Sequence, residues 1–354
     1  MERILGASPI RFDSEIMNKW VVITSINGPQ PRYSDYAERG WKIVVVGDSK
    51  SPNHLFADWT NNSQYFLSAQ IQSEMYPELS SAIGFNTYAR KNLGYLYALS
   101  HGASVIWETD DDTFIREELP DPHALFENSE RYVVSGDSKV FNPYIFFAPD
   151  SGLWPRGFPL KQVSLGRFSN SDSIVVSRQN FQLGDVDLIQ TLVNLEPDVD
   201  AIFRLVFGDT RLEFPYRNDL VLLGKGVVAP GNTQSTFWST KRSFPYLYVP
   251  RYVDFRFCDI LKSYVAQSKL NMAYGGFLVD QLRNPHDYLD DFKSEVSCYL
   301  HSEKVIEIVT QPTSPSIIEI YRELIEANIC VDQELEILSL FITELRKIGF
   351  EVAD

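Results

Sequence analysis

The sequence contains few of the residues that several classes of site require. Its three cysteines, Cys258, Cys298 and Cys330, are scattered and have no CxxC spacing. They indicate neither a disulfide framework nor a thiolate metal site, and they suit a reducing compartment. Positive charge is also scarce, with 32 Lys and Arg against 47 Asp and Glu, for a net charge of -15. A general nucleic-acid binder needs a basic face, so we expect no nucleic-acid partner.

Long apolar runs are missing as well. No stretch of about 18 apolar residues is present to span a bilayer. The first 20 residues have no basic start followed by an apolar segment, so they do not resemble a signal peptide. We therefore expect a cytoplasmic protein whose membrane association, if any, is peripheral and at the inner membrane face. The chain is 44% hydrophobic and 13% aromatic, which is ample for a sizeable core.

Short apolar runs alternate with helical patterns in the first third of the chain. Residues 20–26 (WVVITSI) and 42–48 (KIVVVGD) predict buried strands, with a short helix at 34–39 between them. Residues 86–100 (NTYARKNLGYLYALS) have helical spacing, and 104–107 form the next apolar run. Continuous apolarity is typical of parallel strands covered on both faces. We predict an α/β fold with a mainly parallel sheet and a ligand site at the carboxyl ends of its strands.

The rest of the chain gives weaker patterns. The remaining expected elements are loops and short strands at 135–180 and helices at 185–195, 257–269, 315–327 and 332–348. From about residue 286 the composition becomes charged and aliphatic. We therefore divide the chain into a catalytic domain at 1–285 and a helical C-terminal segment at 286–354.

An acidic turn, ETDDDT at 108–113, follows the third apolar run. Side chains alternate in direction at a strand end, so Asp110 and Asp112 can point the same way. Two converging carboxylates favour a hard divalent cation, Mg²⁺ or Mn²⁺, which would neutralise a diphosphate leaving group. The spacing does not match a calcium-binding EF-hand loop. The alternative is an exposed acidic turn without a ligand.

Blocks of the sequence resemble the plant STELLO proteins. The resembling blocks are 20–26, 40–52, 86–112, 195–205 and 283–292. They run from about residue 19 to 300 and leave the last 50 residues without a match. The chain departs from STELLO in lacking a transmembrane anchor and in matching only loosely at 225–245. A weaker likeness extends to the reversibly glycosylated polypeptides, the UDP-arabinopyranose mutases, which also carry a DDD turn.

The resemblance implies a glycosyltransferase of the GT-A fold. It makes Asp110 and Asp112 the metal-binding pair of a DxD motif. It also places a set of side chains around the nucleotide, the pyrophosphate or the sugar of the donor, namely Thr24, Ser25, Asp48, Arg90, Asn92 and Asp111. Arg90 could instead hold one of the carboxylates, since Arg suits bidentate pairing, or begin a solvated helix.

Acceptor-side roles follow from later blocks. Asp259, with Arg256, stands where a GT-A carboxylate often contacts the acceptor, and we nominate it as general base; a helix cap or a salt bridge with Arg256 is the alternative. His286 is a candidate metal ligand or phosphate contact, although a lone His is more often structural. Asp198 and Asp200 contact sugar or cap a turn.

Three functions are compatible with these patterns. The first is a glycosyltransferase that uses Mn²⁺ or Mg²⁺ and a nucleotide-sugar donor, most often UDP-linked. Its acceptor would be a glycan or a lipid-linked glycan in surface polysaccharide synthesis. The second is a UDP-sugar mutase with the same donor pocket. The third is a non-catalytic regulator of a glycan synthase.

Overall fold

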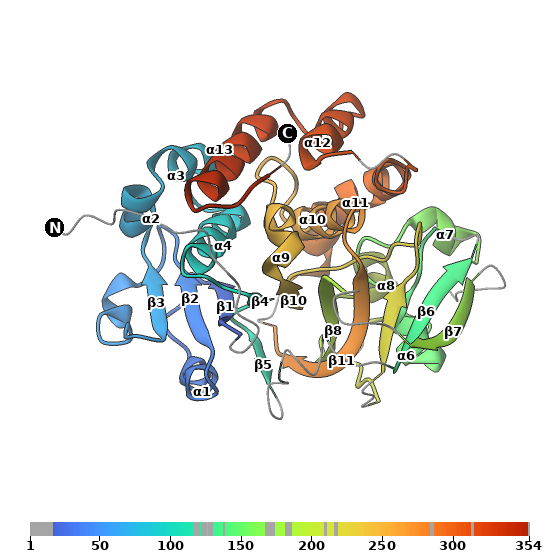
Figure 1. The fold of residues 1–354 in the computed structure, drawn as a ribbon. Coiled ribbons are helices and arrows are strands. Elements are labelled where there is room, and N and C mark those ends of the chain that lie inside the picture. Colours follow the sequence, from blue (N-terminus) through green and yellow to red (C-terminus); the bar gives the residue numbers. More distant parts are fainter. Residues whose placement is uncertain are drawn as a thin grey trace.

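The computed structural model describes most of the chain. The described residues are 17–115, 121, 126, 130–136, 139–166, 174–180, 186–208, 211–215, 219–283, 287–312 and 315–352. They form one large mixed sheet with helices on both faces (Figure 1). The predicted α/β class is confirmed. Within these residues no helix is both long and apolar enough to cross a membrane.

The strands form one sheet in the order β3-β2-β1-β4-β10-β8-β11-β9-β6-β7, with β5 paired to β11. The strand bounds are β1 Lys19–Thr24, β2 Lys42–Val46, β3 Gln64–Leu67, β4 Val105–Thr109, β5 Thr113–Ile115, β6 Glu130–Gly136, β7 Ile174–Asn180, β8 Leu188–Leu195, β9 Leu220–Leu223, β10 Ser235–Ser239 and β11 Met272–Gln281.

Strand direction explains where a ligand site can form. The four strands β3, β2, β1 and β4 are parallel, as predicted for the first third of the chain. Beyond β4 the sheet is mixed: β10 is antiparallel to both β4 and β8, and β8 is parallel to β11. The carboxyl ends of β1, β2, β4, β8 and β11 therefore meet at one edge. The chain adds β2 on one side of β1 and β4 on the other, which makes this edge a topological switch point.

One predicted helix is wrong, and the helices at 69–83, 201–207 and 240–243 were not predicted. The α-helix bounds are α1 Arg32–Glu38, α2 Ala69–Met75, α3 Pro77–Ile83, α4 Lys91–Ser100, α6 Pro143–Phe147, α7 Leu160–Ser164, α8 Ala201–Phe207, α9 Thr240–Ser243, α10 Cys258–Gln267, α11 Tyr288–Val309, α12 Ile317–Glu326 and α13 Gln333–Lys347. Short 3-10 turns cover Asn53–Phe56, Tyr88–Arg90, Pro149–Ser151 and Phe244–Leu247. The helix predicted at 185–195 is wrong, because that segment is the buried strand β8. The predicted loop region 135–180 contains the short helices α6 and α7.

The core has two layers because both faces of the sheet are covered. On one face Val22 and Val44 pack with the helices, while on the other Val21 and Ile43 pack with α1. Helices α4, α9, α10 and α11 lie on the first face in Figure 1, and α1 lies on the opposite one. This two-sided burial is the reason the strand sequences are continuously apolar.

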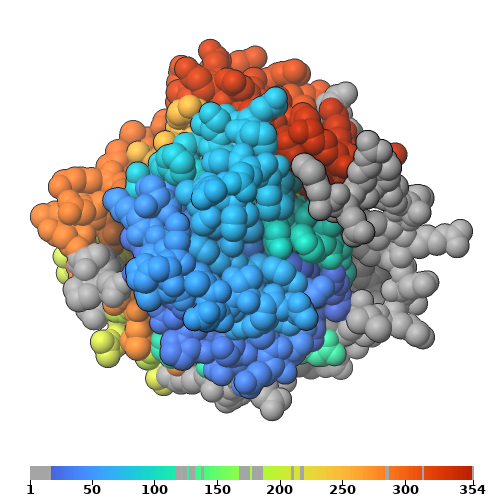
Figure 2. Space-filling view, turned by 90° about the vertical axis from the view of Figure 1, so that its left-hand side faces the viewer, coloured from blue at the N-terminus to red at the C-terminus, as the bar shows by residue number. Residues whose placement is uncertain are grey.

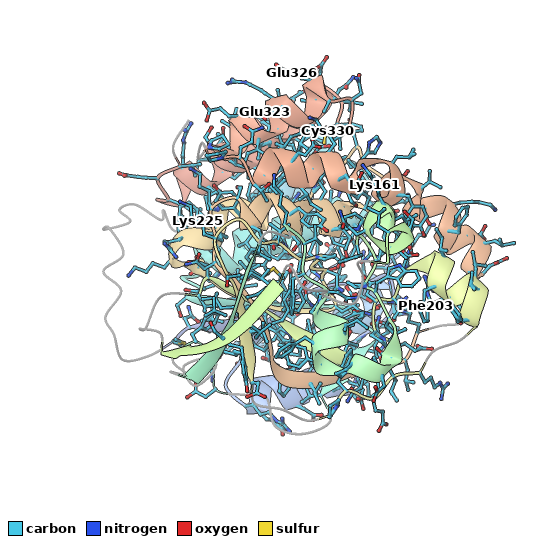
Figure 3. All side chains as sticks on the ribbon, turned by 90° about the vertical axis from the view of Figure 1, so that its right-hand side faces the viewer. Lys161, Phe203, Lys225, Glu323, Glu326 and Cys330 are labelled. Atoms are coloured by element: carbon cyan, nitrogen blue, oxygen red, sulfur yellow. The ribbon has the colours of Figure 1, made fainter. Side chains whose placement is uncertain are left out.

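The C-terminal helices contribute to the same core. Helix α13 packs against α3 and α4, and α12 packs against α11 and α13. Figure 2 shows the red C-terminal helices beside the blue N-terminal elements on one face. Cys330, labelled in Figure 3, is buried between α12 and α13.

Candidate functional site

A cleft of about 640 Å³ opens at the edge where the carboxyl ends of the parallel strands meet. Its wall includes Thr24 and Ser25 at the end of β1, Asp48 after β2, and the acidic turn after β4. Gln281 at the end of β11 and Thr233 just before β10 complete this side. The structure therefore brings the predicted strand-end residues together in one cleft.

Asp111 is held by the end of β1. Its Oδ2 accepts hydrogen bonds from Ser25 Oγ at 2.6 Å and from Asn27 Nδ2 at 2.9 Å. Arg32 Nη2 donates to the Asp111 carbonyl oxygen at 2.7 Å. These bonds fix the middle residue of the DDD run to the neighbouring strand, so Asp111 and Ser25 position the acidic turn.

Asp110 contacts a half-buried tyrosine and a buried lysine. Its Oδ1 lies 2.8 Å from the hydroxyl of Tyr88, which in turn lies 2.6 Å from Thr233 Oγ1. Lys91 Nζ donates to the same hydroxyl at 2.8 Å and lies 3.7 Å from Asp110 Oδ1. Burial raises the pKa of Asp110 to about 7 against the opposing effect of Lys91, and Asp112 adds to the rise. The proton is thus held more tightly than on an exposed carboxyl group.

Asp112 contacts the end of strand β11. Its Oδ1 accepts a hydrogen bond from Gln281 Nε2 at 2.8 Å. Burial raises the pKa of Asp112 as well, with Asp111 adding to the rise, while Gln281 and Arg283 oppose it. Asp110 and Asp112 therefore each have one oriented oxygen and a carboxyl group that is costly to ionise alone.

These two carboxylates fit a divalent cation that brings further ligands with it. No group of three or more His, Cys, Asp or Glu side chains able to hold a metal occurs among the described residues. Mg²⁺ is usually bound by one or two carboxylates plus substrate phosphates and waters. Asp110 and Asp112 match that ligand count, with Tyr88 and Gln281 orienting them. His286, the third predicted ligand, lies outside the described residues.

Asp48 lies on the same side of the cleft as Thr24. Its Oδ1 accepts from the backbone N–H of Ser49 at 2.5 Å, and its Oδ2 accepts from that of Thr87 at 3.3 Å. The Ser51 hydroxyl donates to the Ser25 carbonyl oxygen at 2.7 Å and links the ends of β1 and β2. This wall presents a carboxylate and backbone polar groups to the cleft.

Of two predicted donor contacts, Arg90 lines the cleft and also joins helices, whereas Asn92 lies outside the cleft. The guanidinium of Arg90 donates to Gln72 Oε1 at 2.8 Å and to the Gly84 carbonyl oxygen at 2.6 Å, so it joins α2 and α3 to the start of α4. Asn92 is fully buried and exchanges two hydrogen bonds with the backbone of Val249, at 2.8 and 2.7 Å. Arg90 touches the cleft wall, whereas Asn92 does not line it.

An ion-pair network forms the opposite wall. Arg156 Nη1 and Nη2 each donate to one oxygen of Asp259 at 2.8 Å. The same guanidinium holds Asp198, with Nη2 2.6 Å from Oδ2. Arg256 pairs with Glu295 at 2.7 Å, and Arg283 lies 3.4 Å from Asp198.

This network bears on the proposed base. Both oxygens of Asp259 are occupied by Arg156, so Asp259 must release one hydrogen bond before it can accept a proton from a substrate. Arg256 does not pair with Asp259 through its side chain; its guanidinium reaches Glu295, Asp291 and Asp198. Asp198 lines the cleft, whereas Asp200 is a buried cap at the start of α8.

Sequence reasoning missed several side chains of the site. The missed residues are Asn27, Tyr88, Lys91, Arg156, Thr233, Gln281 and Arg283. Tyr88 and Lys91 lie close to Arg90 in the block from which the helix was predicted. The reasoning that pointed from this block to the acidic turn could therefore have included them. Arg156 comes from a loop-rich region without a helical or strand pattern, and its partner is 103 positions away.

Sequence comparisons agree with the predicted STELLO resemblance. A family model of the STELLO glycosyltransferases matches residues 256–354. "Probable glycosyltransferase STELLO1" of Arabidopsis thaliana is 26% identical over 363 residues, and "Probable glycosyltransferase STELLO2" of the same plant is 23% identical over 358; each alignment covers 94% of this chain. The chain spans 45% of the length of these relatives. The resemblance is confirmed, and it includes the last 50 residues, where none was expected.

One solved structure is similar over most of the chain. It is the mannosyltransferase PcManGT from Pyrobaculum calidifontis in complex with GDP-Man and Mn²⁺. The likeness covers 96% of this chain and 77% of that chain, with a TM-score of 0.42 and 7% sequence identity. A likeness at this level carries no argument about the site.

Proposed function

We propose that the protein is a glycosyltransferase that uses a nucleotide-diphosphate sugar, with UDP as the most favoured nucleotide. The observation that carries the proposal is the half-buried pair Asp110 and Asp112 at the carboxyl end of β4, in a cleft at the switch point of the sheet. The names of the STELLO relatives support the reaction class.

The donor would lie along the strand ends. The nucleoside would face Thr24 and Asp48, and the diphosphate would face the acidic turn. Asp110 and Asp112 would hold Mn²⁺ or Mg²⁺, which when bound stabilises the negative charge that develops on the leaving diphosphate. Hydrogen bonds from Tyr88 and Gln281 orient the two carboxylates. The hydrogen bonds of Asp111 with Ser25 and Asn27 fix the turn to the end of β1.

The acceptor, a glycan or glycolipid, would enter beside the ion-pair wall of Arg156, Arg256 and Asp259. A base role for Asp259 requires an acceptor hydroxyl to displace one Arg156 hydrogen bond. In that case the product has inverted anomeric configuration. If Asp259 stays paired, the reaction can proceed with retention instead. The anomeric configuration of the product, read by NMR coupling constants, decides between these roles.

Calorimetric titration with UDP, CDP and GDP tests the donor site. Each diphosphate is titrated with and without Mn²⁺ into the wild-type chain, Asp112→Ala and Asp58→Ala. Asp58 is exposed and outside the cleft, so its variant controls for the change in net charge. We expect one diphosphate to bind in a Mn²⁺-dependent way, and at least tenfold more weakly in Asp112→Ala only.

Other outcomes would change the conclusion. If no diphosphate binds with or without metal, both transfer and mutase chemistry are excluded and a regulatory role is favoured. If a diphosphate binds, product analysis of the matching nucleotide sugar separates the remaining two. A mutase converts the sugar without an acceptor, whereas a transferase releases the free diphosphate.

A further inference from the structure

Lys91 is a fully buried lysine placed directly behind the acidic turn. Its Nζ donates to the Tyr88 hydroxyl at 2.8 Å and to the Thr109 carbonyl oxygen at 3.0 Å, and it lies 3.7 Å from Asp110 Oδ1. Lys91 does not line the cleft, so a ligand in the cleft would not touch it. Its charge therefore acts on Asp110 through short buried distances, where solvent screens little.

The acidic turn is balanced by cationic side chains. Lys91 faces Asp110, the guanidinium of Arg32 donates to the Asp111 carbonyl oxygen, and Arg283 acts electrostatically on Asp112. Three cationic groups thus lie around the three aspartates of the turn. The negative charge of Asp259 also repels that of Asp110, but Arg156 forms an ion pair with Asp259 and neutralises its charge. Among the described residues no third acidic or imidazole ligand joins the pair. A bare dication would therefore gain little attraction here.

A nucleoside diphosphate changes this balance. It supplies phosphate oxygens as further ligands and negative charge that offsets both the cation and Lys91. We propose that Lys91 keeps the acidic turn from taking up a divalent cation alone, so that metal and nucleoside diphosphate bind together. Lys91 is then a positioning residue that sets metal affinity without touching metal or substrate. This inference rests on the proposed function.

Manganese binding, followed by calorimetry and by the electron paramagnetic resonance of unbound Mn²⁺, tests the proposal without turnover. The wild-type chain is titrated with Mn²⁺ alone and with saturating UDP, or with whichever diphosphate the donor-site titration selects. We expect the diphosphate to strengthen Mn²⁺ binding at least tenfold. Equal Mn²⁺ affinity with and without diphosphate would overturn the proposal, and this comparison needs no variant.

The variant Lys91→Met removes the charge while retaining similar length. It should bind Mn²⁺ alone at least tenfold more tightly than wild type, and the strengthening by diphosphate should shrink. Lys42→Met, at the opposite end of β2, loses the same charge far from the turn and should behave as wild type. If Lys91→Met does not fold, Lys91→Gln replaces it. A charge-free variant that binds Mn²⁺ alone no better than wild type contradicts the inference.

Failure of the two proposals can be told apart. If neither wild type nor Lys91→Met binds Mn²⁺ even with diphosphate, the donor site itself is wrong and the inference falls with it. If wild type binds the Mn²⁺–diphosphate pair but Lys91→Met gives no tighter binding of Mn²⁺ alone, the donor site stands and only the role of Lys91 is rejected.

Discussion

Asp198 and Asp200 stand two positions apart and have opposite electrostatic surroundings. Although burial opposes it, Arg156, Arg283 and Arg256 hold the pKa of Asp198 well below its usual range. Burial raises the pKa of Asp200 to about 7, and the nearby Glu295 adds to the rise. Asp200 caps α8 by accepting from the Ile202 N–H at 2.8 Å, while its Oδ2 has no hydrogen bond within the described structure.

The stability of the fold should therefore depend on the ionisation of Asp200. Its folded pKa of about 7 lies above the ordinary 3.8, so the folded protein holds this proton more tightly than the unfolded chain. Between pH 4 and 7 this group makes stability fall as pH rises. Asp200→Asn keeps the capping acceptor and removes the charge. We expect the advantage of the variant over wild type to grow as the pH rises from 4 to 7 and to reach at most about 4 kcal/mol at pH 8.

Thermal unfolding across pH 5 to 9 measures this difference. Asp287→Asn is the matched control, because Asp287 caps α11 with the same kind of hydrogen bond to Leu289 but is exposed. It should show no stability gain at high pH. A gain for Asp200→Asn that is equal at pH 5 and pH 8 would mean that ionisation of Asp200 is not the cause.

Single residues were predictable where a strand end fixed their place. Asp48 and the acidic turn lie in the cleft because parallel strands end at one edge. Asn92 was misread, because its partner Val249 is 157 positions away and only the tertiary fold brings it near. The pairing of Asp259 to Arg156 likewise has no local signal in the sequence. Residue type and spacing thus gave the location of the acidic site but not which of its polar groups are already occupied.

Among the elements, apolar runs rich in β-branched residues were read correctly and β8 was not. Its sequence LIQTLVNL mixes apolar and polar residues at spacings that also suit a helix, and short apolar runs do not distinguish the two. The pairing of β8 between β10 and β11 decides in favour of a strand. Its buried Gln190 bonds the neighbouring segment through the Asn232 N–H at 2.8 Å, which no local pattern shows.

Helix α4 depends on a glycine for its close approach to the sheet. A Cβ built at Gly94 would lie 2.5 Å from Val46 Cγ2 and 2.8 Å from Val22 Cγ1. Gly94→Ala should lower the free energy of unfolding by about 1–3 kcal/mol through overpacking, although Ala is favoured in a helix by about 1 kcal/mol. The displaced helix would also move Lys91 and Tyr88 and so weaken Mn²⁺–diphosphate binding.

Urea unfolding of single and double variants tests the contact. Val46→Ala removes the nearest methyl group, so Gly94→Ala combined with Val46→Ala should be more stable than the sum of the two single effects predicts. If the two effects simply add, the clash with Val46 is not the source of the loss.

At the scale of the whole molecule, the C-terminal helices connect the two walls of the cleft. Glu334, in the first turn of α13, is fully buried although it carries a carboxylate. It accepts hydrogen bonds from the backbone N–H groups of Arg251 and Tyr252 at 2.9 and 2.8 Å and from the Tyr248 hydroxyl. These residues begin the segment 248–257 that leads to Phe255 and Arg256 on the cleft wall. Since α13 also packs on α3 and α4, it ties this segment to the N-terminal half.

Glu334→Ala should loosen the acceptor wall and spare the donor wall. Two part-buried N–H groups and one buried hydroxyl would lose their partner, and an unsatisfied buried group costs about 1–3 kcal/mol. We expect faster hydrogen–deuterium exchange across 248–257, while Mn²⁺-dependent diphosphate binding at the strand ends stays within about twofold of wild type, because no donor-site residue contacts Glu334 within the described structure.

Glu336→Ala, exposed on the same helix, is the control and should exchange as wild type. Unchanged protection of 248–257 in Glu334→Ala would show that packing alone, without this carboxylate, holds the wall; loss of diphosphate binding at retained fold would show that the two walls are coupled.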